Sequence, residues 1–99
     1  MIKTMDELLD VMEAKGYRVT EYRYKLQFHK EASAEVREMI KDDGCSALRL
    51  QDALNERSRY KSYLWGVASM AVTFCMISKE EGEAIWESFR KEETGSGTA

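Results

Sequence analysis

The fold depends on residues 21–42, which read EYRYKLQFHKEASAEVREMIKD. Apolar and polar residues alternate over 22–29, the pattern of a half-buried strand. At about 100° per residue, however, the whole stretch divides into one apolar and one polar sector. The alternation accounts for about eight residues and the helical period for about twenty, and a lone strand would lack a partner. We therefore expect a helix over about 21–42, with Thr20 as its N-cap, and keep a strand near 17–29 as the alternative.

Capping signals divide the rest of this proline-free chain into further helices. Thr4 opens a helix over about 5–15 that Gly16 ends. Ser46 can cap the next helix, which either breaks in the polar stretch before Tyr60 or continues through it. A Ser-x-x-Glu box at Ser78 opens the last helix. The sequence predicts an all-α, compact bundle of four to five helices, with one domain over 1–93 and a flexible tail over 94–99.

Residues 60–77 are expected to form the central apolar helix of this bundle, because apolar side chains cover nearly its whole circumference. Cys75 lies in this run and is expected to be a reduced core thiol. The polar stripe of the helix consists only of small residues, which permit the close approach of another helix. That neighbour is either internal or a second copy of the chain. The residues of this predicted homodimer surface are Ser62, Gly66, Ser69 and Thr73.

Catalytic and metal-binding patterns are missing from the sequence. The one histidine, His29, lies one helical turn before Ser33, but no third catalytic residue or oxyanion loop accompanies the pair. We expect it to be a satisfied core histidine. Two distant cysteines form neither a disulfide framework nor a zinc site, and they suit the reducing cytoplasm. We expect no cofactor and no metal, no catalysis, and no membrane span, since the longest apolar run is too short.

Basic residues are concentrated in the middle of a chain whose formal net charge is −3. One edge of the helix over 21–42 is basic, and a second group interleaves bases with tyrosines over 57–63. Such surfaces can contact phosphates or an acidic protein. The candidate partner-binding residues are Arg23, Lys30, Arg37, Lys41, Arg57, Arg59, Lys61 and Tyr63.

These features predict a protein-interaction module, an adaptor, regulator or inhibitor that binds a larger protein. An aromatic residue such as Tyr17, Tyr22 or Tyr63 is expected to anchor the contact. The alternative is a nucleic-acid-binding regulator that uses the basic helix edge. In size, helical character and lack of catalytic motifs the chain resembles the small accessory proteins of phages and conjugative elements. Since some of these block host defence or nucleic-acid enzymes by occupying a charged surface, the resemblance implies an inhibitor.

Overall fold

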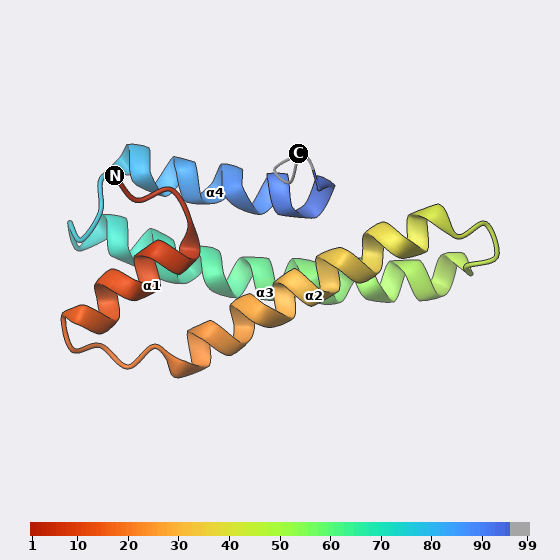
Figure 1. Cartoon of the computed structure of the whole chain (residues 1–99), viewed down its shortest axis with the longest axis horizontal. Helices are drawn as coiled ribbons and strands as arrows, with labels where there is room; N and C mark the ends of the chain where they lie inside the picture. Colours follow the sequence, from red (N-terminus) through yellow and green to blue (C-terminus); the bar gives the residue numbers. More distant parts are fainter. Residues whose placement is uncertain (96–99) are drawn as a thin grey trace.

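The computed structural model describes residues 1–95, which contain four α-helices and no strand (Figure 1). The helices are α1 (Met5–Ala14), α2 (Thr20–Lys41), α3 (Ala47–Thr73) and α4 (Lys79–Thr94). α2 and α3 form a long antiparallel hairpin, and α1 and α4 pack against one end of it. The all-α prediction is confirmed, and the alternative of a strand near 17–29 is wrong because that segment enters α2.

α2 packs centrally and contacts each of the other helices. Its buried residues fall in the apolar sector that the helical period predicted: Leu26, His29, Ala32, Ser33, Val36 and Met39. The predicted cap is shifted by one residue, because Thr20 is already helical and Val19 occupies the N-cap without a side-chain hydrogen bond. Val19 is buried in the core instead. Packing of this apolar side chain therefore fixes the start of α2 where a polar cap was expected.

α3 is one continuous helix that ends at Thr73, so the predicted helix over 60–77 runs too far. The Cys75 N–H donates to the carbonyl of Val72 at 3.0 Å, and the Met76 N–H donates to that of Ala71 at 2.8 Å. These two bonds form a Schellman motif, with Cys75 in the left-handed position at φ 60°. The motif turns the Cys75 side chain into solvent. The prediction of a core thiol is therefore wrong.

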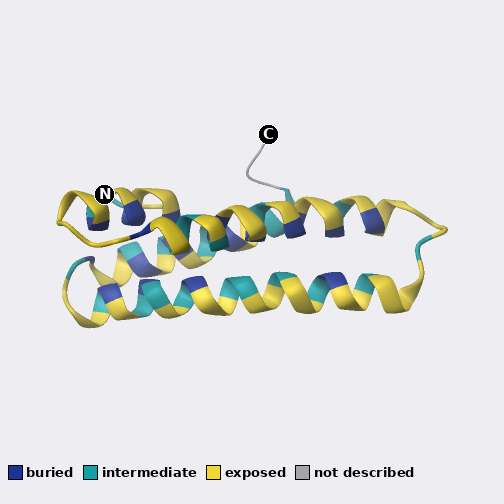
Figure 2. Ribbon diagram, turned by 90° about the horizontal axis from the view of Figure 1, so that it is seen from below, coloured by how far each residue is buried: buried dark blue, intermediate teal, exposed yellow. Residues whose placement is uncertain are grey.

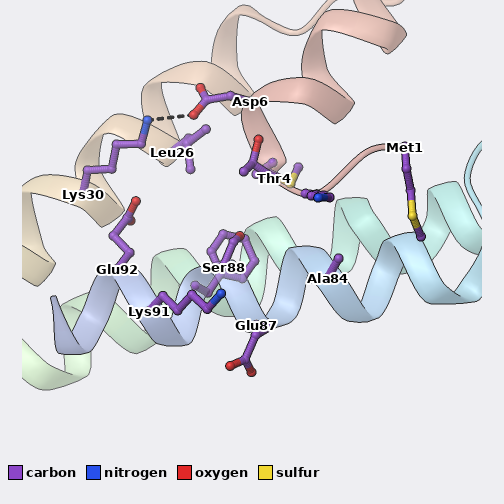
Figure 3. A pocket seen from close by; sticks show the side chains of 13 residues that line it. Met1, Thr4, Asp6, Leu26, Lys30, Ala84, Glu87, Ser88, Lys91 and Glu92 are labelled. Carbon is purple, nitrogen blue, oxygen red and sulfur yellow. Dashed lines mark hydrogen bonds and ion pairs between the residues drawn. The ribbon is translucent and has the colours of Figure 1, made fainter. Parts of the chain in front are cut away.

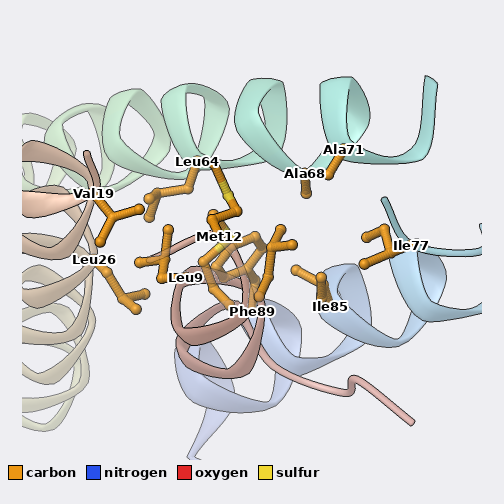
Figure 4. Packing of buried hydrophobic residues seen from close by; sticks show 12 residues of the cluster. Leu9, Met12, Val19, Leu26, Leu64, Ala68, Ala71, Ile77, Ile85 and Phe89 are labelled. Atoms are coloured by element: carbon orange, nitrogen blue, oxygen red, sulfur yellow. The ribbon is translucent and has the colours of Figure 1, made fainter. Parts of the chain in front are cut away.

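The main core lies at the end of the hairpin where all four helices meet (Figure 4). α1 contributes leucines and methionines, α3 contributes Leu64 and two alanines, and α4 contributes Ile85 and Phe89. At Gly82, α4 comes so close to α3 that an added Cβ would lie 2.8 Å from Val72 Cγ2. The cluster consists of Met5, Leu8, Leu9, Met12, Val19, Leu26, Leu64, Ala68, Ala71, Ile77, Ile85 and Phe89.

The hairpin extends beyond α4 as an outer arm, defined here as residues 38–56. Buried positions become fewer along the hairpin toward the loop that joins α2 and α3 (Figure 2). A small second cluster of Val36, Met39 and Ala53 supports this part. The whole hairpin lies along the long axis of the molecule, whose dimensions are 47 × 26 × 19 Å.

The last helix is capped as predicted, with the reciprocal Ser78–Glu81 capping box. α4 continues through Thr94, and Gly95 follows in the left-handed conformation. Thr94, the first residue of the predicted tail, thus belongs to α4, and residues 96–99 lie outside the described part of the chain. Among residues 1–95, none of the helices combines the length and apolar character needed to cross a bilayer.

Candidate functional site

His29 lies at the centre of an ion cluster that joins α2 to the end of α4. Its side chain is fully buried, with Nδ1 2.7 Å from Glu92 Oε1 and Nε2 3.2 Å from Glu93 Oε2. The Phe89 ring packs edge-on against the imidazole, at 5.3 Å between centroids. The expectation of a satisfied core histidine is confirmed.

Glu93 is the residue through which α3 joins this cluster. Lys61 Nζ donates to Glu93 Oε1 at 2.9 Å, and Arg57 Nε lies 3.4 Å from Oε2. Burial alone would raise the pKa of the Glu93 carboxyl, but the hydrogen bonds from Lys61 and His29 and the charge of Arg57 outweigh it and lower that pKa. The carboxylate thus stays charged and holds three helices together.

The geometry of this cluster suits a structural clamp. Ser33 Oγ is buried without a hydrogen-bond partner among the described residues, so it makes no bond to His29 that would activate it. No solvent reaches the imidazole, whose exposed fraction is 0 %. In the described part of the chain no group of three or more His, Cys, Asp or Glu side chains is arranged to hold a metal ion.

The first part of the predicted basic edge is tied to α1. Arg23 Nη2 donates to Asp10 Oδ1 at 2.9 Å, and Lys30 Nζ donates to Asp6 Oδ2 at 2.8 Å. The second pair closes one side of a cleft between α1, α2 and α4 (Figure 3). The floor of that cleft is apolar: Leu26 and Phe89 are buried there, whereas Met1, which also lines the cleft, is exposed.

The remaining basic candidates are distributed over α2 and α3. Arg37 donates to the backbone carbonyl of Glu92, and Lys41 lies 3.8 Å from Glu38 at the surface. Arg59 is exposed and forms no ion pair within residues 1–95. Because acidic groups and a backbone carbonyl contact most of these cations, the predicted basic edge mainly connects helices within the molecule.

The clearest open surface is an apolar groove of about 680 Å³ beside the C-terminal half of α3. Tyr63, one of the predicted partner-binding residues, lies in it together with Tyr17 and Tyr22. The three tyrosines named as candidate anchors therefore share one surface. We call this surface the tyrosine groove, and its lining residues are Met12, Tyr17, Tyr22, Tyr63, Gly66, Val67, Met70, Ala71, Phe74 and Met76.

Large apolar side chains in the tyrosine groove remain in contact with solvent. Phe74 is 66 % exposed, Met70 55 % and Tyr17 52 %. The Tyr22 and Tyr63 rings pack with centroids 6.1 Å apart, and Lys25 Nζ lies 5.4 Å from the centroid of the Tyr63 ring. Burial against its neighbours raises the pKa of the Tyr63 hydroxyl, and the charge of Glu21 adds to the shift. A tyrosine hydroxyl is neutral at pH 7 even at its usual pKa of about 10, and the upward shift acts in the same direction, so the Tyr63 side chain suits an apolar contact.

The sequence pattern did not reveal that Met70 and Phe74 face solvent. Both lie in the run that was expected to be covered on all sides, and they are exposed because no other helix packs over this face of α3 within the described residues. A helix that is apolar on nearly every side is usually buried, so the pattern gave no sign that one of its faces would stay open.

No family model, curated protein or solved structure matches the chain.

Proposed function

We propose that the chain is a non-enzymatic protein-interaction module that binds a larger protein through the tyrosine groove. The observation that carries this proposal is the convergence of Tyr17, Tyr22 and Tyr63, from a loop and two helices, beside the exposed Met70 and Phe74. Tyrosine and methionine are enriched in the cores of protein interfaces, and a few aromatic anchors carry most of the binding energy there.

The composition of the groove supports a protein partner. Methionine side chains are flexible and polarizable, so Met12, Met70 and Met76 can adapt to the shape of an apolar partner. Single exposed apolar residues are ordinary, whereas a contiguous patch is typical of a binding surface. The partner supplies apolar side chains to the groove, and Lys25 and Arg59 favour acidic groups beside them.

Nucleic-acid binding through the basic edge of α2 and residues 57–63 is the second candidate function, and the exposed Arg59 favours it. Phosphate contacts from Arg23, Lys30 or Lys61 would have to compete with their present carboxylate partners. For this reason the protein partner ranks first. The proposed setting is the cytoplasm, with a role as regulator or inhibitor, and the two free cysteines accord with it.

The predicted homodimer surface adjoins the same groove. Ser62 and Thr73 are exposed on α3, Ser69 is half-buried, and Gly66 belongs to both surfaces. A second copy and a larger partner would therefore compete for one face of the molecule.

The test is affinity capture with the tagged full chain in three forms: wild type, Phe74→Ser and Tyr24→Ser. Tyr24 is the matched control, because it is 61 % exposed but lies outside the groove. We expect a protein that binds wild type and Tyr24→Ser, but not Phe74→Ser, and that survives nuclease treatment. Equal capture by all three forms would contradict the proposal. Loss of every partner after nuclease, with a steep log-linear dependence on salt, would favour nucleic acid.

A further inference from the structure

Gly66 occupies a position where the fold itself does not require glycine. A Cβ added there would meet nothing within 4 Å, whereas one added to Gly82 would collide with Val72. Glycine in the middle of a helix is unfavourable, because it leaves the backbone flexible in the unfolded chain. Gly66 lies well inside α3. Its lack of a side chain therefore leaves room for a close approach from outside the chain.

The exposed face around Gly66 has the shape of a helix contact. Tyr63, Gly66, Met70 and Phe74 follow one another at helical spacing and span about 17 Å along α3. Met12, Tyr17 and Tyr22 form a wall on one side of the groove. No residue of α4 lines the groove. A straight helix can thus lie along α3 without meeting a second wall.

We propose that the occupant of this face is α3 of a second copy of the chain, packed antiparallel with the two-fold axis between Gly66 and Val67. This inference uses the groove of the proposed function but does not depend on the larger partner. In this arrangement Tyr63 of each copy lies opposite Met70 of the other. Contacts between methionine sulfur and aromatic rings are favourable, and a two-fold interface requires such reciprocal pairs.

The charge distribution along α3 favours the antiparallel direction. Residues 62–78 contain no charged side chain, and Arg57, Arg59 and Lys61 directly precede them. The last turn of α3 contains no basic residue to offset the negative end of the helix dipole. Antiparallel packing brings Arg59 of each copy beside Phe74 and that negative helix end of the other. Parallel packing would place Arg59 opposite Arg59.

The size of the face predicts a weak dimer. A stable interface covers about 800 Å² on each partner. That area would be about one eighth of the 6514 Å² of surface that the chain exposes. A single groove on one side of α3 supplies less than that standard area, so we expect dissociation constants in the range of about 10 μM or weaker. A dimer of this strength covers the tyrosine groove at high protein concentration and dissociates when a partner of higher affinity binds there. Self-association therefore regulates access to the same site.

The test is sedimentation velocity of the full chain over concentrations from about 1 μM to about 1 mM, which brackets such a dissociation constant. Wild type should shift from monomer to dimer. Gly66→Gln should weaken the dimer at least about tenfold, because the added side chain blocks the close approach, while its melting temperature stays the same or rises. Ser58→Gln is the matched control on an exposed position of α3 outside the groove, and it should dimerise like wild type.

Arg59→Gln tests the direction of packing. The antiparallel arrangement predicts a weaker dimer, because the contact with the helix end is lost, and parallel packing predicts a tighter one, because a like-charge pair is removed. Arg49→Gln, an exposed charge change in the first turn of α3, should have no effect. A wild-type chain that remains monomeric throughout, or a Gly66→Gln chain that dimerises normally, overturns the inference. Capture of a larger protein by a monomeric chain would leave the proposed function standing.

Discussion

Gly82 in α4 lies directly against Val72 in α3, at a distance that leaves no space for a Cβ atom. Val72 is β-branched and stiff, so it cannot turn away easily. The absence of a side chain at residue 82 therefore sets how closely α4 approaches α3, next to the capping box that starts α4.

Gly82→Ala should destabilise the protein by a net amount of up to about 2 kcal/mol, because overpacking a core usually costs about 1–3 kcal/mol. This cost exceeds the gain in helix propensity of about 1 kcal/mol that alanine brings. Urea denaturation at neutral pH measures the difference. Gly66→Ala is the control: the same exchange, at a position with open space, should stabilise the fold by about 0.5–1 kcal/mol. The double variant with Val72→Ala should recover part of the loss, and a stabilised Gly82→Ala single variant would refute the close contact.

Cys75→Gly should stabilise the protein by about 0.5–1 kcal/mol, since glycine adopts the left-handed conformation without the steric cost that cysteine bears there. The side chain is exposed, so its loss leaves no cavity. Thermal unfolding under reducing conditions provides the measurement. Cys75→Ala keeps the unfavourable conformation and should show no such gain; equal melting temperatures for the glycine and alanine variants would speak against the Schellman turn.

Glu93→Gln should destabilise the fold at pH 7 by about 1–3 kcal/mol, the range for lost hydrogen bonds to a charged group. The carboxylate has a lowered pKa in the folded state. Its stabilising contribution is therefore complete above the unfolded value of about 4.3 and is lost as the pH falls through the lower folded value. The free energy of unfolding of wild type should fall over this acid range, and that of Glu93→Gln should fall less steeply.

Glu87→Gln is the matched control for this titration. Glu87 lies on the same helix and pairs with Arg90 at the surface, where the hydrogen bond from Arg90 also lowers the pKa of its carboxyl but solvent screens the pair. The acid profile of Glu87→Gln should therefore lie closer to that of wild type than the profile of Glu93→Gln does. If Glu87→Gln and Glu93→Gln gave identical profiles, the cluster around His29 would not be the origin of the pH dependence.

Amide hydrogen exchange should divide the hairpin into two parts. Amides of the outer arm, residues 38–56, should exchange faster than those around Leu64 and Ile85, because few buried apolar contacts support the arm. Mass spectrometry of peptides from both parts of α3 gives this comparison within one helix. Uniform protection along α3 would show that the small cluster of Val36, Met39 and Ala53 is sufficient to stabilise the outer arm.

The sequence predicted helices where local signals were strong. The apolar sector of residues 21–42, the Thr4, Ser46 and Ser78 caps and the Gly16 stop all depend on residues close together in the chain. The end of α3 was missed, because a cysteine takes the position that glycine usually marks. The turn itself is local, but it was not visible in the sequence because no glycine marks the left-handed position.

The candidate site was predictable only in part. The three tyrosines were proposed as candidate anchors from their residue type, but their meeting on one surface depends on how α1, α2 and α3 pack. The carboxylates that contact Arg23, Lys30 and Lys61 come from helices distant in sequence, so the pairing of the basic edge could not be read from the helical wheel.

The outer arm can change in length without changing the tyrosine groove. The main core, the ion cluster around His29 and the tyrosine groove all lie outside the arm, so removing the same number of turns from α2 and from α3 within the arm would leave them unchanged. The long dimension of the molecule can therefore be shortened or extended, by engineering or by natural insertion, without redesigning the groove for which we propose a partner.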